Sequence, residues 1–195
     1  MCSLCVHKGF IYSVGGFIDS KTKTKTRCYG LNRSKSCEES SRMKHSRFAC
    51  ELVACENYFY AIGGFDSNDE TLKNVEKYDP ESDEGTEVAS THDPHAYSIS
   101  VVKDEQIFVV SSETFQVYFP NENVWKKLPG SELDVTDSVK LAHFDGKFYA
   151  FVRKIRSYIS ETKVFQPTTR AWETFKPLPN EILCITDLTV LNEVF

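Results

Sequence analysis

The chain has little of what marks a helical, exported or membrane-spanning protein. Only two of its 195 residues are methionine and only two are tryptophan, and no apolar run approaches the ~18 residues of a membrane-spanning helix. Its first residues, MCSLCVHK, have neither the basic head nor the long apolar core of a signal peptide. No helical periodicity of useful length occurs. We therefore expect a cytoplasmic protein that does not bind a membrane, with cytoskeletal association left open.

The cysteines and histidines do not predict a disulfide or a metal site. Seven cysteines is an odd number, and in the absence of an export signal we expect free thiols in a reducing compartment. Cys2 and Cys5 have the spacing of a zinc half-site, but no second pair stands at matching spacing. His92, Asp93 and His95 share a loop and could hold a metal, but no further ligand spacing supports one.

Motifs of catalysis are missing as well. The sequence has no nucleophile elbow, no phosphate loop and no His-Glu-x-x-His helix. We therefore expect no catalytic residue, no cofactor, no metal and no small-molecule substrate. The chain is predicted not to be an enzyme.

Charge is spread unevenly along the chain. The net charge is −5, yet the first fifty residues are basic and residues 51–195 are acidic. The basic residues of the first fifty positions are concentrated around Lys21, Lys23, Lys25 and Arg27. Such a cluster could contact an acidic partner or nucleic acid. No aromatic residue interleaves with these lysines, so we favour a solvated loop and expect no nucleic-acid partner.

What the chain does have is an internal repeat. Residues 58–62, YFYAI, read as an apolar strand that ends in Gly63-Gly64, where glycine permits positive φ and close backbone approach. The same pattern recurs three more times, and the four diglycine positions are 48, 48 and 41 residues apart. The earlier copy keeps the diglycine as Gly15-Gly16. The two later copies replace it with Ser111-Ser112 and Val152-Arg153. Such a period indicates a propeller or a solenoid.

Aromatic rings recur in step with this pattern. One ring position is occupied by Tyr29, Tyr78, Tyr118 and Phe165, and tryptophan follows seven residues later as Trp125 and Trp172. We expect Tyr78, Tyr118 and Phe165 to be buried on the third strand of their repeats. Both tryptophans should pack in the fourth strand.

These landmarks resemble the kelch repeat, whose hallmarks are an apolar strand ending in Gly-Gly, then a tyrosine, then a tryptophan. Residues 74–80, NVEKYDP, are similar to the corresponding phrase of kelch-like proteins, as is the run from Met43 and Arg47 to Gly64. The resemblance covers nearly the whole chain. It implies an all-β propeller segment of four-stranded antiparallel blades.

The repeat phase predicts four blades and the start of a fifth, arranged as an open arc. The expected boundaries are 1–42, 43–90, 91–132 and 133–180 for the four blades, and 181–195 for the beginning of the next. Within each blade the strands are called A to D from the centre outward. Because these strands are antiparallel, the B-to-C and D-to-A loops emerge at one end of every blade.

Long variable loops on a rigid scaffold are where binding is expected, and in kelch-like proteins partners bind at this end. The positions of this sequence that match are Phe17, Arg47, Phe65, Asp66, Tyr97, Glu113, Ser138 and Lys154. An exposed aromatic or arginine there would suit a protein interface. The alternative is that Phe17 and Phe65 pack beneath their own loops.

The resemblance implies a protein-binding role. In kelch-like adaptors, the propeller follows BTB and BACK domains and recruits substrates for cullin-type ubiquitin ligases. The resemblance implies this substrate-recruiting role for the chain. The alternative is a cytoskeletal scaffold that binds actin. The expected partner is therefore a protein, either a ligase substrate or actin.

Overall fold

The computed structural model describes residues 2–8, 10–18, 21–22, 25–30, 37–111, 114–128, 138–154, 159–166, 168–169 and 171–177. For residues 17–40 of this set, and at several strand ends of the last sheet, it describes the backbone alone. The expected start of a fifth blade at 181–195 lies outside the described residues. No described helix is long and apolar enough to cross a membrane.

The described chain consists of four four-stranded antiparallel sheets and one short hairpin. Sheet one orders β1(Ser3–His7), β2(Phe10–Val14), β5(Lys25–Gly30) and β6(Cys37–Arg42), and sheet two orders β7(Glu51–Cys55), β8(Tyr58–Ile62), β9(Val75–Asp79) and β10(Glu84–Val88). Sheet three holds β11(Ile99–Lys103), β12(Gln106–Val110), β13(Phe115–Phe119) and β14(Val124–Lys127). Sheet four holds β15(Ser138–Phe144), β16(Lys147–Lys154), β17(Ile159–Gln166) and β18(Ala171–Pro177).

The short hairpin was not expected from the sequence. It pairs β3(Phe17–Ile18) with β4(Lys21–Thr22) inside what reads as a polar loop between strands B and C of the first repeat. By contrast, the turn at Asp145-Gly146 joins β15 to β16 at a dipeptide that is a strong hairpin signal in the sequence. Both residues have positive φ, 47° and 73°, which is the requirement of a two-residue type I′ hairpin.

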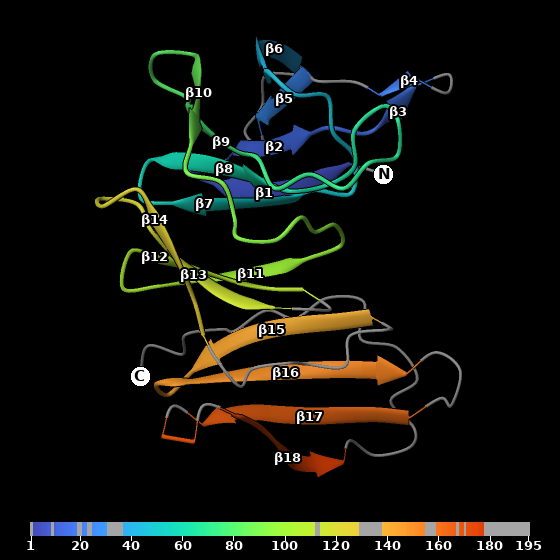
Figure 1. Cartoon of the computed structure of the whole chain (residues 1–195). Coiled ribbons are helices and arrows are strands. Elements are labelled where there is room, and N and C mark those ends of the chain that lie inside the picture. Colours follow the sequence, from blue (N-terminus) through green and yellow to red (C-terminus); the bar gives the residue numbers. More distant parts are fainter. Residues whose placement is uncertain are drawn as a thin grey trace.

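The sheets follow one another in sequence order and form an arc, without closing into a ring in the part described (Figure 1). Each interface between neighbours has its own apolar core. Tyr12 of sheet one packs with Phe59 of sheet two, Tyr60 of sheet two with Tyr118 of sheet three, and Phe115 of sheet three with sheet four. The sheets are thus held by aromatic burial between blades, as the ring periodicity predicts.

The outer face of sheet one is uncovered among the described residues. Along β1, Ser3, Cys5 and His7 are half-buried, whereas Leu4 and Val6 are 63% and 64% exposed. Alternate residues of a strand face opposite sides, so one side of β1 packs on sheet two and the other faces solvent. This is the arrangement expected of an open arc.

The repeated rings are buried to different degrees. Tyr118, Phe165 and Trp125 are at most 6% exposed, which confirms the expectation for them. Tyr78 is only half-buried, so the expectation that it is buried is wrong. Trp172 is half-buried too, but it lies in β18 and packs against Phe115 and Phe165, with ring centroids 5.6 and 5.4 Å apart, as expected for the fourth strand. The side chain of Tyr29 on β5 is not described.

Trp125→Ala should therefore destabilise the protein more than Trp172→Ala. Trp125 stacks on Tyr118 with centroids 4.9 Å apart and donates from Nε1 to the Ala89 carbonyl, 2.8 Å away. Truncation of a buried ring of this kind costs about 3–5 kcal/mol. Trp172 is half-exposed and its Nε1 has no partner among the described residues. Urea unfolding of both variants measures the difference, and equal losses would contradict this account of the rings.

Candidate functional site

The candidate site is the loop end of sheets two and three, where three segments are joined through their backbones. Phe48 N donates to the Phe65 carbonyl at 3.0 Å, and Phe65 N donates back at 2.8 Å. Tyr97 N donates to the Ala49 carbonyl at 3.0 Å. The two D-to-A segments and the long B-to-C loop thus form one continuous backbone platform.

The diglycine makes this close approach possible. Gly63 and Gly64 have φ of +60° and +97°, and Gly15 and Gly16 have +70° and +105°, which confirms the predicted positive φ. Gly64 N donates to the His95 carbonyl at 2.8 Å. A Cβ on Gly63 would lie only 2.2 Å from that same oxygen. The loop end of sheet two therefore contacts the next blade directly, with no space for a side chain.

Three aromatic rings, here called the aromatic cluster, are carried on the platform. Phe48 is 9% exposed and stacks on Phe65, with ring centroids 5.2 Å apart. Phe65 is half-buried and meets the edge of Tyr97 at 5.7 Å. Tyr97 itself is 64% exposed. An exposed tyrosine backed by two rings is the type of residue that dominates protein interfaces.

The Asp66 side chain accepts hydrogen bonds from backbone N–H groups of its own loop. Its Oδ1 accepts from Asn68 N at 2.8 Å and from Glu70 N at 2.9 Å, which closes a compact turn beside Phe65. Asp66 is half-buried and directly follows Phe65 of the aromatic cluster. The exposed Asp69 and Glu70 follow it in the same loop, so this edge of the cluster is acidic.

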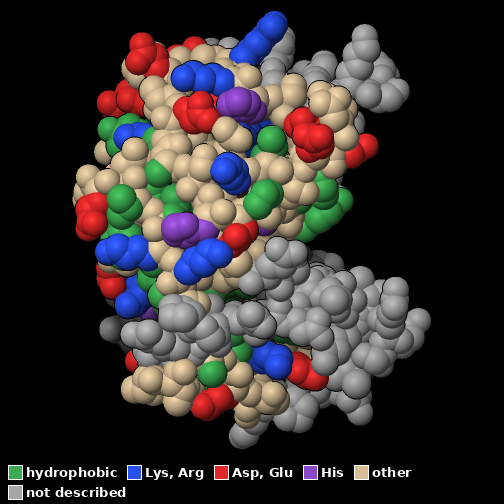
Figure 2. Space-filling model, viewed as in Figure 1, with side chains coloured by type: hydrophobic (Ala, Val, Ile, Leu, Met, Phe, Trp, Pro, Cys, Tyr) green, Lys and Arg blue, Asp and Glu red, His purple; other side chains and the backbone are tan. Residues whose placement is uncertain are grey.

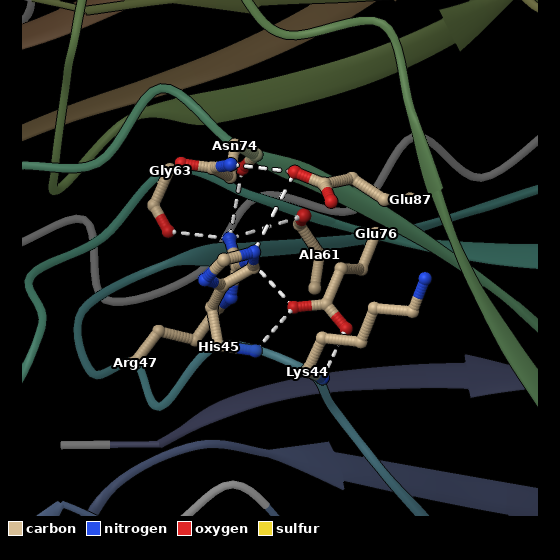
Figure 3. Close-up of polar contacts among 8 residues, drawn as sticks. All are labelled: Lys44, His45, Arg47, Ala61, Gly63, Asn74, Glu76 and Glu87. Atoms are coloured by element: carbon tan, nitrogen blue, oxygen red, sulfur yellow. Dashed lines mark hydrogen bonds and ion pairs between the residues drawn. The ribbon is translucent and has the colours of Figure 1, made fainter.

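Arg47 does not lie on the surface, and the prediction that it contacts a partner is corrected. Its side chain is 0% exposed and forms an ion pair with Glu76, Nη2 to Oε1 at 2.7 Å (Figure 3). Its Nη1 donates to the carbonyls of Gly63 and Asn74, both at 2.9 Å. A buried charge must be paired and hydrogen-bonded, and here that need places Arg47 beneath the platform as its support.

Glu76 completes this support from β9. Its carboxylate accepts from Lys44 N at 2.7 Å and from His45 N at 3.0 Å, in addition to the Arg47 guanidinium (Figure 3). One side chain thereby fixes the D-to-A segment that carries Phe48. Sequence reasoning missed Glu76, although a charged residue in a buried strand is a signal that a partner must exist.

Sheet three repeats the arrangement without charge. The position of Arg47 is taken by His95, 48 residues later, and the position of Glu76 by Gln116 on β13. Gln116 Oε1 accepts from His92 N at 3.0 Å, as Glu76 Oε2 accepts at 2.7 Å from the N of Lys44, 48 residues before His92. Burial lowers the pKa of His95 to about 4, against a smaller opposing effect of Asp93. The His95 imidazole is therefore neutral, and neither of its ring nitrogens has a hydrogen-bond partner among the described residues.

This buried histidine predicts a loss of stability in acid. The unfolded chain binds a proton at His95 near pH 6.5, whereas the folded chain does so only near pH 4. Its contribution to stability is therefore lost as the pH falls from 6.5 to 4, with a slope of at most about 1.4 kcal/mol per pH unit. Chemical unfolding at a series of pH values should show a shallower decline in His95→Gln than in the original protein. The exposed His92→Gln serves as control, and equal slopes in all three proteins would contradict the assignment.

The structure does not describe the side chains of the remaining predicted contact residues. Phe17 lies in β3, Ser138 begins β15 and Lys154 ends β16, with only the backbone of each described. Glu113 lies outside the described residues. Their roles stay predictions.

The surface and the titratable groups do not form an obvious chemical site. Figure 2 shows one face on which basic, acidic and histidine side chains are interspersed rather than gathered by sign. Among the described residues no group of three or more His, Cys, Asp or Glu side chains is placed to hold a metal ion. In the loop between β10 and β11, Asp93 pairs instead with Lys127 at 2.6 Å.

Comparison with known proteins identifies the repeat. Residues 46–90 match the family model described as the kelch motif. Human "Kelch repeat and BTB domain-containing protein 2" is 33% identical over 104 residues, covering 53% of this chain and 17% of that protein. Human "Kelch repeat and BTB domain-containing protein 8" is 26% identical over 150 residues, covering 71% and 25%. The chain therefore spans only a quarter or less of these relatives.

A solved structure supports the same fold. The structure of YjhT superposes with a TM-score of 0.69, covering 91% of this chain and 65% of that one, at 10% sequence identity. Identity this low shows the fold alone. The chain is thus a kelch-repeat segment with distant homology to kelch repeat and BTB domain-containing proteins over part of its length.

Proposed function

We propose that the loop end of sheets two and three binds a protein partner through the aromatic cluster. The observation that carries the proposal is Tyr97, which is largely exposed yet held by the ring of Phe65 and by its own backbone bond to Ala49. A rigid tyrosine loses little conformational entropy on binding. The buried Arg47–Glu76 pair keeps the platform beneath the cluster in place before a partner arrives.

We further propose that the chain is the substrate-recognition part of a kelch-like adaptor for a cullin-type ubiquitin ligase. Its support is the partial homology to relatives whose names include a BTB domain, together with the resemblance to kelch-like adaptors. On this proposal the protein acts by binding, without catalysis of its own, in the cytoplasm. No contact in the described residues favours actin, so actin binding is kept as an outcome of the test.

Affinity purification from cells separates the two roles. The natural gene product that contains this chain would be purified beside its Tyr97→Ala variant and a control variant, Glu122→Ala. Glu122 is exposed in the C-to-D turn of sheet three, at the opposite end of the blades. The adaptor proposal predicts that a cullin is purified with all three proteins. A client protein should be purified with the original and with Glu122→Ala, and be lost from Tyr97→Ala. Co-sedimentation with actin filaments, without any cullin, would overturn it.

A further inference from the structure

The inner strands bring four equivalent residues together around the axis of the arc. The strands β1, β7, β11 and β15 lie side by side in order (Figure 1). In their registers, Ser3 pairs with Val14, Glu51 with Ile62, Ile99 with Val110 and Lys140 with Phe151. The four partners all directly precede the diglycine position of their repeats. The residues that they pair with, here called the inner ring, are therefore Ser3, Glu51, Ile99 and Lys140.

The inner ring lines an open cavity. Its lining consists of these four residues and the residue that follows each of them, and its volume is about 290 Å³. Ser3, Glu51 and Ile99 begin their inner strands and Lys140 is the third residue of β15, so the cavity lies toward the end of the blades where the D-to-A loops arrive. A space of this size corresponds to about ten water molecules or one small ligand.

Glu51 is fixed in this cavity with acceptor capacity to spare. Its Oε1 accepts from Ser100 N at 3.0 Å and from Ser100 Oγ at 2.6 Å, across the boundary between sheets two and three. No hydrogen bond to its other oxygen is found among the described residues. Burial raises the pKa of Glu51 to about 7, because the hydrogen bonds from Ser100 and the charge of Lys140 only partly offset desolvation. A cation in the cavity would therefore stabilise the ionised carboxylate.

Lys140 supplies the opposite charge. It lines the cavity from sheet four and acts on Glu51 through space, but no hydrogen bond or ion pair of its Nζ occurs in the described residues. The cavity thus offers an acceptor on one side and a cationic donor on another, with aliphatic side chains between them. A ligand with a single charge would satisfy one of these groups and leave the other unpaired.

We propose that this cavity binds a small zwitterion of the amino-acid type, with its ammonium group on Glu51 and its carboxylate on Lys140. This goes against the expectation from the sequence that the chain has no small-molecule ligand. That expectation rested on motifs, whereas the residues of the inner ring are 48, 48 and 41 positions apart and no local motif joins them. The inference is independent of the proposed protein partner, because the aromatic cluster contributes no residue to the cavity lining.

The test is a nuclear magnetic resonance titration of this chain that follows the Ser100 amide, which donates directly to Glu51. The probes are glycine, β-alanine and 4-aminobutyrate, three zwitterions with increasing charge separation. Butylamine and butyrate match the last of these in length but carry one charge each. We expect a saturable shift of the Ser100 amide with at least one zwitterion, at an affinity at least tenfold above both singly charged probes.

Variants connect the shift to the two charges. Glu51→Gln keeps an oxygen that accepts from Ser100, and Lys140→Met keeps the aliphatic stem, so both should fold. Each should weaken zwitterion binding at least tenfold, whereas Glu56→Gln and Lys147→Met, exposed at the opposite end of the blades, should leave it unchanged. The proposal is overturned if no zwitterion gives a saturable shift, if butylamine or butyrate binds equally well, or if either cavity variant binds like the original.

Discussion

Gly64→Val is expected to destabilise the protein by about 2–6 kcal/mol, the sum of backbone strain and overpacking. The φ of Gly64 is +97°, which a β-branched residue does not adopt without strain. A Cβ there would also lie 2.6 Å from the Phe48 carbonyl oxygen and 2.9 Å from Cys50 Cβ. Neither neighbour can move easily, because Phe48 is bonded to Phe65 through its backbone and Cys50 is buried.

Lys73→Val in the same loop is the matched control. Lys73 is exposed, so the same side chain introduced there should change the free energy of unfolding by less than about 0.5 kcal/mol. Urea titration of both variants, with hydrogen exchange of β7 and β8, measures the effect and its location. Equal unfolding midpoints would show that the diglycine has no special role in this fold.

The third repeat explains why the diglycine is not universal along this chain. Ser111 occupies the first glycine position without a positive φ. Its backbone N donates to the Thr114 carbonyl at 2.9 Å, so strand B turns almost directly into strand C. With no long loop to accommodate, this blade does not need the left-handed backbone, and side chains are tolerated there.

The second large effect is expected at the buried ion pair. Arg47→Met and Glu76→Gln should each destabilise the protein by about 3–5 kcal/mol, because each leaves a buried charged or polar partner uncompensated. The double variant Arg47→Met with Glu76→Gln removes both charges together, so that neither is left buried without its partner. This double variant should recover at least half of the larger single loss, a non-additivity expected of residues in direct contact.

A surface pair provides the control for this experiment. Lys127 and Asp93 are 2.6 Å apart but 49% and 33% exposed, so Lys127→Met should cost less than about 1 kcal/mol. Thermal and urea unfolding of the whole set decides the matter. Strictly additive losses at Arg47 and Glu76 would mean that the pair does not act as one unit.

The strand pattern was predictable because it depends on local rules. Alternating apolar residues gave the inner strands, and Asp145-Gly146 gave its turn, since the hairpin type is set by two residues. Short-range reasoning also placed the diglycine, whose φ is a property of its own backbone.

The candidate site was only partly predictable, because it depends on contacts between repeats. Tyr97 and Phe65 were placed at the end of the blades that carries the B-to-C and D-to-A loops, from the strand order that the kelch resemblance implies. The burial of Arg47 could not be predicted in the same way. It depends on Glu76, which lies on another strand, and on the carbonyl of Gly63 in the diglycine turn, and Arg47 donates to both. The inner ring likewise needs the register of four separate sheets, and that register is known only once the strands are paired.

The most direct test of the central claim is site-specific photocrosslinking to the protein partner. A benzophenone amino acid would replace Tyr97 in one protein and Glu122 in another, and each would be irradiated in the presence of the partner identified by affinity purification. The account predicts that the partner is crosslinked at position 97 and not at 122, and that unlabelled original protein competes with the crosslink. Crosslinking at 122 with none at 97 would contradict the assignment of the loop end as the binding face.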